Sequence, residues 1–222
     1  MDMKENQFNI ITISRQMGSG GTYIGYLAAK ELGFRYLDRE ILQQAANKLG
    51  IEPGMLERYD GRSASLMENI VQSFCFSMPE MSNLPPLGRP VYNKDLFVLE
   101  SKIVKEVADS CNAVIIGRGG FHILKDRTDT IHIFVHAPLN YRIEMIMKEQ
   151  KITNEREAQK MIEESDHERT KFIRNMIGTD WCDARNYHLC IDSSVVGFPA
   201  CVEMITKFVS IKRNASTKII KE

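Results

Sequence analysis

The chain has 222 residues, of which 43% are hydrophobic, and 29 basic side chains balance 29 acidic ones, so its formal net charge is zero. This length suffices for one large hydrophobic core with insertions, and the charge balance excludes a global field that would favour nucleic acid or an anionic membrane. No apolar run approaches the roughly 20 residues of a membrane helix, and residues 1–7 lack the apolar segment of a signal peptide, so we expect one cytoplasmic domain over residues 1–222.

Phe8 to Ser14 forms the first predicted strand, which leads into a glycine-rich turn and then a helix over residues 22–32. Glycines in such a turn expose successive backbone N–H groups, and the helix start adds a partial positive charge. The arrangement is therefore typical of a phosphate-binding loop, although an ordinary strand-to-helix turn has the same outline.

The turn departs from the common phosphate-loop pattern G-x-x-x-x-G-K-S/T, in which the lysine contacts the β- and γ-phosphates and the hydroxyl holds magnesium. Gly20 matches the second glycine and Thr22 supplies the hydroxyl. Gly21 stands in place of the lysine, and Arg15 stands in place of the first glycine. The motif alone therefore leaves open whether this turn binds a nucleotide.

A second short strand, Phe34 to Leu37, ends in Asp38 and Arg39 before a helical pattern over residues 41–49. Asp38 is suited to cap that helix, which would make it structural. Ligands of open α/β sheets bind at the carboxyl ends of the strands, which makes both side chains candidates for a ligand site. The two interpretations remain open, and they are evenly balanced for Arg39.

Residues 51–93 do not follow the alternation of strands and helices. Short helical pieces over 53–59 and 64–76 precede a proline-rich stretch, and compact domains seldom carry so long an irregular segment without a use for it. We interpret this region as an insertion, either a lobe that covers the substrate or a dimer contact. A clear amphipathic helix over residues 94–111 follows it.

Ala113 to Gly117 is an apolar strand that ends in Arg118, Gly119 and Gly120. An arginine between glycines lies on a backbone that can approach a ligand closely, and its planar guanidinium suits a phosphate bidentately. The alternative is a turn whose arginine points into water. The residue types favour a second anion site.

The strand over Thr130 to Val135 carries His132, which we expect to be covered by packing together with His136 and not to ligate a metal. Pro138 suits the first turn of the helix that follows. We place Arg142 on the polar side of that helix.

Asn154 resembles the N-cap of a helix whose later part, Asp166 to Arg174, is highly charged. Asp166 and Arg169 share a helix face, so an exposed, ion-paired helix is one interpretation. Concentrated basic side chains are also what a phosphoryl-transfer lid requires. A last short strand over 187–191 and an amphipathic helix over 202–211 follow.

The cysteines are odd in number, widely spaced and without a C-x-x-C pair. This pattern favours reduced thiols over disulfides or a zinc site, and we expect most of them to be small core residues. They are Cys75, Cys111, Cys182, Cys190 and Cys201.

The alternation of mostly apolar strands with helices predicts an α/β fold with a parallel sheet covered on both faces. Right-handed crossovers bring the carboxyl ends of all strands to one edge of the sheet. The segments expected at that edge are Gly18 to Thr22, Asp38 and Arg39, Arg118, and Asp192.

Five segments carry a pattern in their order and spacing: Ser14-Arg15-Gln16-Met17-Gly18-Ser19-Gly20-Gly21, Tyr36-Leu37-Asp38-Arg39-Glu40-Ile41, Gly117-Arg118-Gly119, Asp166-x-x-Arg169-x-x-Phe172, and Asp180-Trp181 with Tyr187 to Ser194. Together they resemble the cytidylate kinase-like family, a branch of the P-loop nucleoside monophosphate kinases. The resemblance implies a P-loop NTPase-type, three-layer α/β/α fold with a five-stranded parallel sheet. It divides the chain into a core (8–50 and 94–214), a helical monophosphate-binding lobe inserted at 51–93, and a lid at 150–180.

The resemblance also implies the residues of a site for ATP, Mg2+ and a nucleoside monophosphate. Gly18, Ser19, Gly20, Gly21 and Thr22 would cradle the donor triphosphate, with the Thr22 hydroxyl on magnesium. Asp38, Arg39 and Arg118 would bind the acceptor, and Arg169 would stabilise the transferring group. Such a reaction needs positioned cations and no nucleophilic side chain.

Two departures from the family pattern bear on the implied function. Gly21 removes the lysine charge, for which Arg15 is the candidate replacement in catalysis. Gly119 replaces an aspartate after Arg118, which leaves cytidine specificity open. We predict a kinase with a CMP-like acceptor, a monomer or homodimer whose partners are small-molecule nucleotides; the alternatives are a nucleotide-binding regulatory protein with little or no kinase activity and a kinase for another small metabolite.

Overall fold

The computed structural model describes residues 9–38, 68–69, 71–72, 74–75 and 94–219. The predicted helix over 41–49, most of the predicted inserted lobe and Arg39 lie outside the described residues. The lobe and its role in acceptor binding therefore stay predictions.

Five parallel strands form one sheet in the order β2-β3-β1-β4-β5. β1 (Ile10–Arg15) lies at the centre, between β3 (Ala113–Ile116) and β4 (Thr130–His136). β2 (Arg35–Leu37) and β5 (Leu189–Asp192) are the edge strands. Because all pairs are parallel, the carboxyl ends of the strands meet at one edge, as the sequence predicts.

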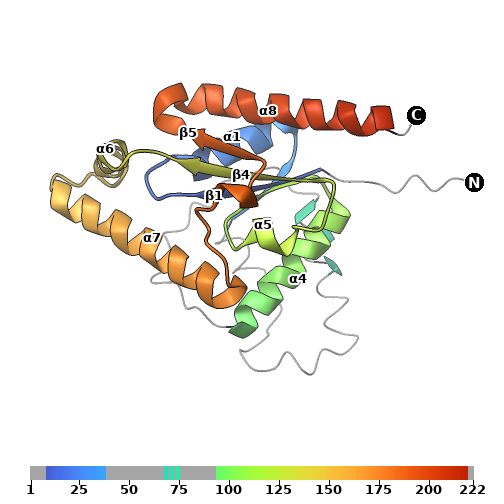
Figure 1. The fold of residues 1–222 in the computed structure, drawn as a ribbon, viewed down its shortest axis with the longest axis horizontal. Helices are drawn as coiled ribbons and strands as arrows, with labels where there is room; N and C mark the ends of the chain where they lie inside the picture. The colour runs from blue at the N-terminus through green and yellow to red at the C-terminus, as the bar shows by residue number, and fades with distance from the viewer. Residues whose placement is uncertain (1–8, 39–67, 70, 73, 76–93, 220–222) are drawn as a thin grey trace, which may run out of the picture.

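Helices cover both faces of the sheet, which gives the predicted three layers (Figure 1). One face carries α1 (Gly21–Leu32) and α8 (Ser193–Ile219). The other carries α4 (Lys94–Ser110), α5 (Gly120–Ile123) and the carboxyl-terminal part of α7 (Glu155–Ile177). The remaining helices are α6 (Leu139–Gln150), which packs against the amino-terminal part of α7, and the short 3-10 helix η2 (Ala184–Asn186).

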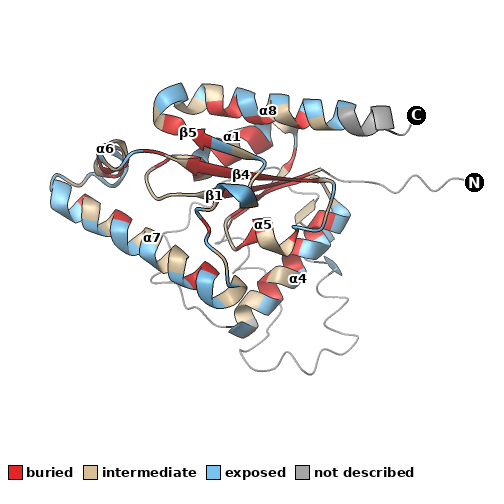
Figure 2. Ribbon diagram, in the orientation of Figure 1, coloured by how far each residue is buried: buried red, intermediate tan, exposed pale blue. Residues whose placement is uncertain are grey.

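The strands are apolar along their whole length because both faces of the sheet are covered. Ile11 and Ile13 of β1 pack in the core with α1 and α8, whereas Ile10 packs with α4. All three side chains are fully buried, and Figure 2 shows the strands as the most continuously buried part of the molecule. This rigid sheet positions the turns that follow each strand.

The closing helix is longer than predicted. α8 includes the predicted segment 202–211 but begins at Ser193, and its backbone is interrupted at Gly197 (φ 75°, ψ 161°), two residues before Pro199. By length and composition alone its segment Ser193–Asn214 could cross a membrane, a test that a core helix also passes and that by itself is weak evidence for a membrane span. The inner side of the helix, with Cys201, Val202, Ile205 and Val209, packs in the core beside α1.

The cysteines differ from the expectation of reduced core thiols. Cys75 and Cys111 form a disulfide with a Cα–Cα distance of 5.8 Å, which is an ordinary separation for a bridge. They are 36 positions apart in the sequence, and this spacing carries no signal of the pairing. Cys201 is buried as predicted, whereas Cys182 and Cys190 are exposed, so the core assignment is wrong for those two.

Candidate functional site

The turn between β1 and α1 has a backbone that only glycine adopts without strain at two positions. Gly18 (φ 79°) and Gly20 (φ 73°) are left-handed, and Gly20, which has no side chain to cap the helix, is the N-cap of α1. A Cβ on Gly18 would lie 2.6 Å from the carbonyl oxygen of Arg142. The turn therefore packs closely against α6, and the helix start keeps first-turn N–H groups that lack intrahelical acceptors.

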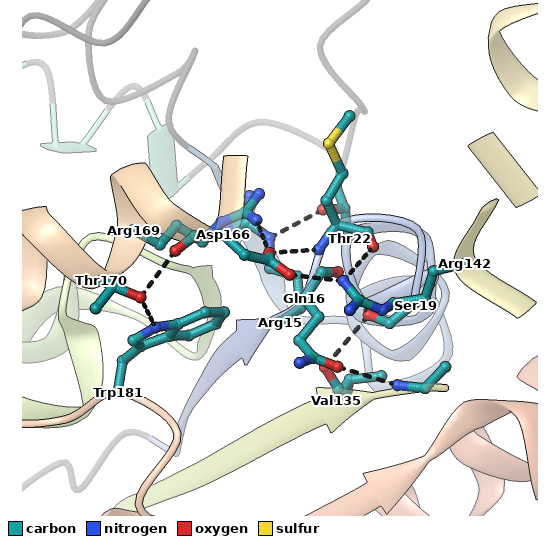
Figure 3. A network of polar contacts seen from close by, with 12 residues as sticks. Arg15, Gln16, Ser19, Thr22, Val135, Arg142, Asp166, Arg169, Thr170 and Trp181 are labelled. Atoms are coloured by element: carbon teal, nitrogen blue, oxygen red, sulfur yellow. Dashed lines mark hydrogen bonds and ion pairs between the residues drawn. The ribbon is translucent and has the colours of Figure 1, made fainter. Parts of the chain in front are cut away.

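Side chains within and around this turn hold its shape. The Ser19 hydroxyl is fully buried and lies 2.8 Å from the Gln16 carbonyl oxygen and 3.3 Å from that of Val135. Ser193 donates to the Ser19 carbonyl oxygen at 2.7 Å, and Ala137 N donates to the Gln16 side chain at 3.3 Å. Ser19 thus faces the interior, and it can serve a ligand only through its backbone. Figure 3 shows the turn tied to the end of β4 by these contacts.

Arg15 lies between the two glycine turns of the site. Its Nε donates to the Thr22 hydroxyl at 3.2 Å, and a Cβ on Gly117 would contact its Nη1. A Cβ on Gly21 would lie 2.5 Å from the Arg15 Cβ and 3.1 Å from the Val135 Cβ. Glycine at position 21 therefore makes room for the Arg15 side chain, which reaches from the β1 turn to the turn after β3.

Asp166 on α7 accepts hydrogen bonds from three elements (Figure 3). Its Oδ1 accepts from Met17 N at 3.1 Å and from Arg169 Nη1 at 2.8 Å, and its Oδ2 accepts from Arg142 Nη1 at 2.6 Å. Arg142 Nη1 also donates to the Met17 carbonyl oxygen at 3.2 Å. α6 and α7 are therefore joined to the β1 turn through a single carboxylate.

Trp181 is connected to the same region of α7. Its Nε1 donates to the Thr170 hydroxyl at 3.0 Å, and that hydroxyl donates to the Asp166 carbonyl oxygen at 2.9 Å. The indole packs edge-on against Phe134 of β4, with ring centroids 5.6 Å apart. Because the chain has one tryptophan, its fluorescence reports on the contact between α7 and the sheet.

The turn after β3 holds Arg118 in a buried ion pair. Gly117, Arg118 and Gly119 all have positive φ, and Arg118 Nη2 lies 3.1 Å from Glu100 Oε1 on α4. The side chains of Arg118 and Glu100 are 7% and 1% exposed, and the guanidinium lies 5.9 Å from the centre of the Phe172 ring. The alternative in which Arg118 points into water is therefore wrong. The carboxylate compensates a cation that would otherwise be buried at high cost.

Gly119 has a packing reason of its own. A Cβ at this position would lie 2.5 Å from the Ile177 Cδ1 at the end of α7. A side chain at this position would require the terminal methyl of Ile177 to shift, and the left-handed backbone (φ 68°) strains residues other than glycine.

The predicted site residues lie mostly at the expected edge of the sheet. Gly18 to Thr22 follow β1, Arg118 follows β3, and Asp38 directly follows β2, where it is 5% exposed. Arg169 lies at the same edge through Asp166, so this pair is part of a network and not a simple exposed ion pair. Arg39 lies outside the described residues.

Sequence reasoning missed three residues of the site: Arg142, Glu100 and Gln16. The placement of Arg142 on a polar helix side is wrong, because its side chain is 10% exposed. Its position could have indicated a site residue, because it lies about one turn into a helix that follows the carboxyl end of a strand. Glu100 stands at helical spacing from Leu96 and Ile103 on the apolar face of α4, and a charge on such a face indicates a buried partner.

The histidines of β4 do not form a metal site, and no group of three or more metal-ligating side chains occurs in the part of the chain that the structure describes. His132 is 5% exposed, and its Nδ1 lies 2.7 Å from the Thr12 hydroxyl. Burial, and then the neighbouring charges of His188 and Lys212, lower its pKa from 6.5 to about 4. The prediction of a packed histidine is confirmed for His132 and wrong for His136, whose side chain is 37% exposed.

Magnesium and a triphosphate fit this turn in their donor chemistry. A hydroxyl such as that of Thr22 is an oxygen ligand of the kind that magnesium takes, and magnesium usually binds through few protein groups together with substrate phosphates. The Thr22 oxygen accepts from Arg15, so the metal and the guanidinium would share or exchange this hydroxyl.

Comparisons with known proteins show the family and the fold of the chain. The model of the cytidylate kinase-like family matches residues 10–195. A cytidylate kinase of Pyrococcus abyssi (strain GE5 / Orsay) is 26% identical over 186 residues, which are 83% of this chain and 84% of the relative. An uncharacterized protein from Eubacterium ventriosum ATCC 27560 aligns with a TM-score of 0.67 and 19% identity, over 91% of this chain and 98% of its own. A gluconokinase from Sinorhizobium meliloti 1021 aligns with a TM-score of 0.52 and 11% identity, over 97% and 99%.

Proposed function

Because the chain belongs to the cytidylate kinase-like family, we propose that it transfers the γ-phosphate of ATP to a nucleoside monophosphate, with CMP as the first acceptor to test. The family relationship supports a nucleotide or small-molecule kinase, and the P-loop kinase fold is compatible with it. The donor would bind at Gly18 to Thr22 with magnesium, and the acceptor near Asp38, Arg39 and Arg118.

The position of Arg15 is the observation that carries this proposal. Phosphoryl transfer depends on cations placed around the moving group and on little covalent chemistry. The Arg15 side chain contacts the Thr22 hydroxyl of the donor turn and reaches Gly117 of the acceptor turn. A cation there stands on the path from donor to acceptor, and it supplies the charge that Gly21 lacks.

Arg169 and Arg118 would complete the set of cations. Arg169 is 27% exposed and lies 2.8 Å from Asp166, beside the β1 turn. Arg118 would exchange its ion pair with Glu100 for the acceptor phosphate, or share it. Both would act as positioned charges that neutralise phosphate oxygens.

The direct test is incubation of the purified full chain with ATP, Mg2+ and each of CMP, UMP, AMP and GMP, with formation of ADP as the readout. Turnover that is highest with CMP supports the proposal. ATP binding without turnover on any acceptor would replace it with a nucleotide-binding regulatory role. Loss of turnover when Mg2+ is removed, with recovery on its return, would support the metal.

A kinase for another small metabolite is the second candidate, and the glycine at position 119 favours it. The aspartate that the resemblance implies after Arg118 is absent, and Gly119 offers no side chain to an acceptor base. Turnover on a sugar or organic-acid acceptor, with none on the four nucleotides, would select this candidate. The fold alone does not choose between the acceptors.

We also propose that the reaction takes place in the cytoplasm on free nucleotides, without a nucleic acid or membrane partner. Light scattering of the purified chain would distinguish between a monomer and a homodimer, which are both compatible with the sequence.

A further inference from the structure

Arg142 is a buried cation that the proposed function does not use. Its side chain is 10% exposed, and its Nη1 makes both hydrogen bonds described above, to Asp166 and to Met17. Its buried Nε has no hydrogen-bond partner among the residues that the structure describes. Because buried polar groups are normally satisfied, this remaining donor points to an acceptor that arrives from elsewhere.

The Asp166 carboxylate has the surroundings that a bound phosphate would have. It accepts from one backbone N–H of the glycine turn and from two guanidinium groups. Backbone amides at a helix start and arginine side chains are the usual donors to phosphate oxygens. Asp166 and a phosphate at this turn are therefore anions that call on the same donors.

We propose that Arg142 is a second phosphate-binding arginine beside Arg169, and that the Asp166 carboxylate competes with the bound phosphate for both of them. The inference rests on the proposed function, since it concerns the same glycine turn. Two anions that share the same donors repel each other, and displacing Asp166 lowers the apparent affinity for phosphate by the free energy of its hydrogen bonds.

The competition couples phosphate binding to α7. Asp166 lies on α7, and the helix is joined to Trp181 through the Thr170 hydroxyl. When phosphate takes the arginines, the carboxylate loses its partners on α6 and on the β1 turn, and the contact between α7 and the sheet changes. Asp166 is thus the residue through which phosphate binding would loosen the contact between the predicted lid and the rest of the protein.

Inorganic pyrophosphate with Mg2+ is the probe for this competition, because it carries phosphate charge without a base or sugar. Calorimetry on the full chain should show that Asp166→Asn tightens pyrophosphate binding about tenfold, because the competing charge is gone. Glu164→Gln is the matched control. It removes the same charge from an exposed position of α7 whose partner is Lys160 at 3.9 Å, and pyrophosphate affinity should stay within about twofold.

The role of Arg142 is tested by substitution and by a double-mutant cycle. Arg142→Met should weaken pyrophosphate binding about 30-fold, and Arg142→Lys should recover part of the loss. In the Arg142→Met background, Asp166→Asn should gain clearly less than tenfold, because one of the contested partners is missing. Arg156→Met, at an exposed position near the start of α7, should leave the affinity unchanged.

Two further measurements keep the outcome decisive. Thermal unfolding of each variant verifies that it is folded, and pyrophosphate should change the Trp181 fluorescence of the unmodified chain. Folded Asp166→Asn protein that binds pyrophosphate equally well or more weakly overturns the competition, and unchanged binding by folded Arg142→Met overturns the second arginine. Absence of pyrophosphate binding by the unmodified chain overturns both.

The failure of this inference can be told apart from failure of the proposed function. If pyrophosphate responds as expected and no acceptor is phosphorylated, the inference stands and the kinase proposal fails. If CMP is phosphorylated while Asp166→Asn does not tighten pyrophosphate binding, the reverse holds.

Discussion

Two turns of this molecule look alike in sequence and differ in their surroundings. Arg15 ends β1 just before a glycine turn, and Arg118 stands between glycines after β3. Arg15 donates to the Thr22 hydroxyl, whereas the Arg118 side chain lies against the Glu100 carboxylate and the Phe172 ring. A strand, glycines and an arginine thus predict a place for an anion, but the partners of the arginine decide what the anion must displace.

Because of this difference, phosphate binding on the donor side and on the acceptor side of the proposed reaction should require different rearrangements of the protein. On the donor side, a phosphate would meet a backbone turn and the Arg15 guanidinium, which donates to the Thr22 hydroxyl. On the acceptor side, it would meet a cation that is already compensated and covered by α7. Binding on the acceptor side therefore requires the Arg118–Glu100 ion pair to rearrange, and substitutions in the two turns should have different signatures.

Substitution of Arg15 should have the largest effect. Arg15→Ala removes a cation that reaches both turns, and we expect the rate of ATP-dependent turnover to fall about 1,000-fold, as losses of phosphoryl-transfer arginines do. Steady-state kinetics with ATP, Mg2+ and the best acceptor measure this. Lys30→Ala, at an exposed position of α1, is the control and should be neutral. Turnover of Arg15→Ala within a few fold of the unmodified chain would remove Arg15 from the machinery.

Substitution of Glu100 should act on stability. Glu100→Gln leaves the Arg118 charge buried without its carboxylate, and we expect the free energy of unfolding to fall by about 3 kcal/mol. Urea unfolding measures this, with Glu106→Gln at an exposed position of the same helix as control. The double variant Glu100→Gln, Arg118→Met should lose less than Glu100→Gln alone. An equal or larger loss in the double variant would show that the Glu100 carboxylate does not compensate the buried charge of Arg118.

A lysine at position 21 tests whether Arg15 has replaced the usual one. Gly21→Lys alone should weaken ATP binding about 100-fold, because its side chain begins where that of Arg15 lies and displaces it. Combining it with Arg15→Gly restores the common pattern at both positions, and ATP affinity should largely recover. If Gly21→Lys alone bound ATP better than the unmodified chain, the idea that Arg15 replaces the usual lysine would be wrong.

Much of this arrangement could be read from the chain. Each apolar strand ends in glycines or charged residues, and parallel strands bring those ends together, so the edge with Arg15, Arg118 and Thr22 was predictable before any coordinates. The amphipathic helix before β3 and the Asn154 cap, which accepts from Arg156 N at 3.0 Å, were likewise local signals.

What could not be read depends on partners far apart in the chain. Asp166 and Met17 are 149 residues apart, and neither carries a local sign of the other. Arg142 was assigned to solvent because helical periodicity describes one helix and not the turn that packs against it. Glu100 was overlooked on an apolar face although a charge there calls for a partner.

Substitution of Thr22 tests whether its hydroxyl serves magnesium or only Arg15 on the donor side. Thr22→Ala should weaken ATP binding about tenfold more with Mg2+ than with a chelator, because only the metal-bound form needs the hydroxyl oxygen. Thr22→Ser keeps that oxygen and should behave like the unmodified chain. Equal losses with and without metal would assign the hydroxyl to Arg15 alone.

The smallest expected effect is a pH dependence of the free energy of unfolding, and it arises from a histidine in the sheet beneath both turns. His132 has its pKa lowered from 6.5 to about 4, first by burial and then by His188 and Lys212, so its charged form is disfavoured in the folded protein. The unfolded chain then binds more protons between these values, and stability should fall by about 1 kcal/mol between pH 7 and pH 5.5. His132→Asn should remove most of this loss of stability. His167 is exposed on α7, and the control variant His167→Asn should lose as much stability as the unmodified chain. Because His132 contacts Thr12 of β1 and neither arginine, Asp166→Asn and Glu100→Gln should show the same slope as the unmodified chain. A slope that changes with Glu100 instead would place the titrating group in the acceptor turn.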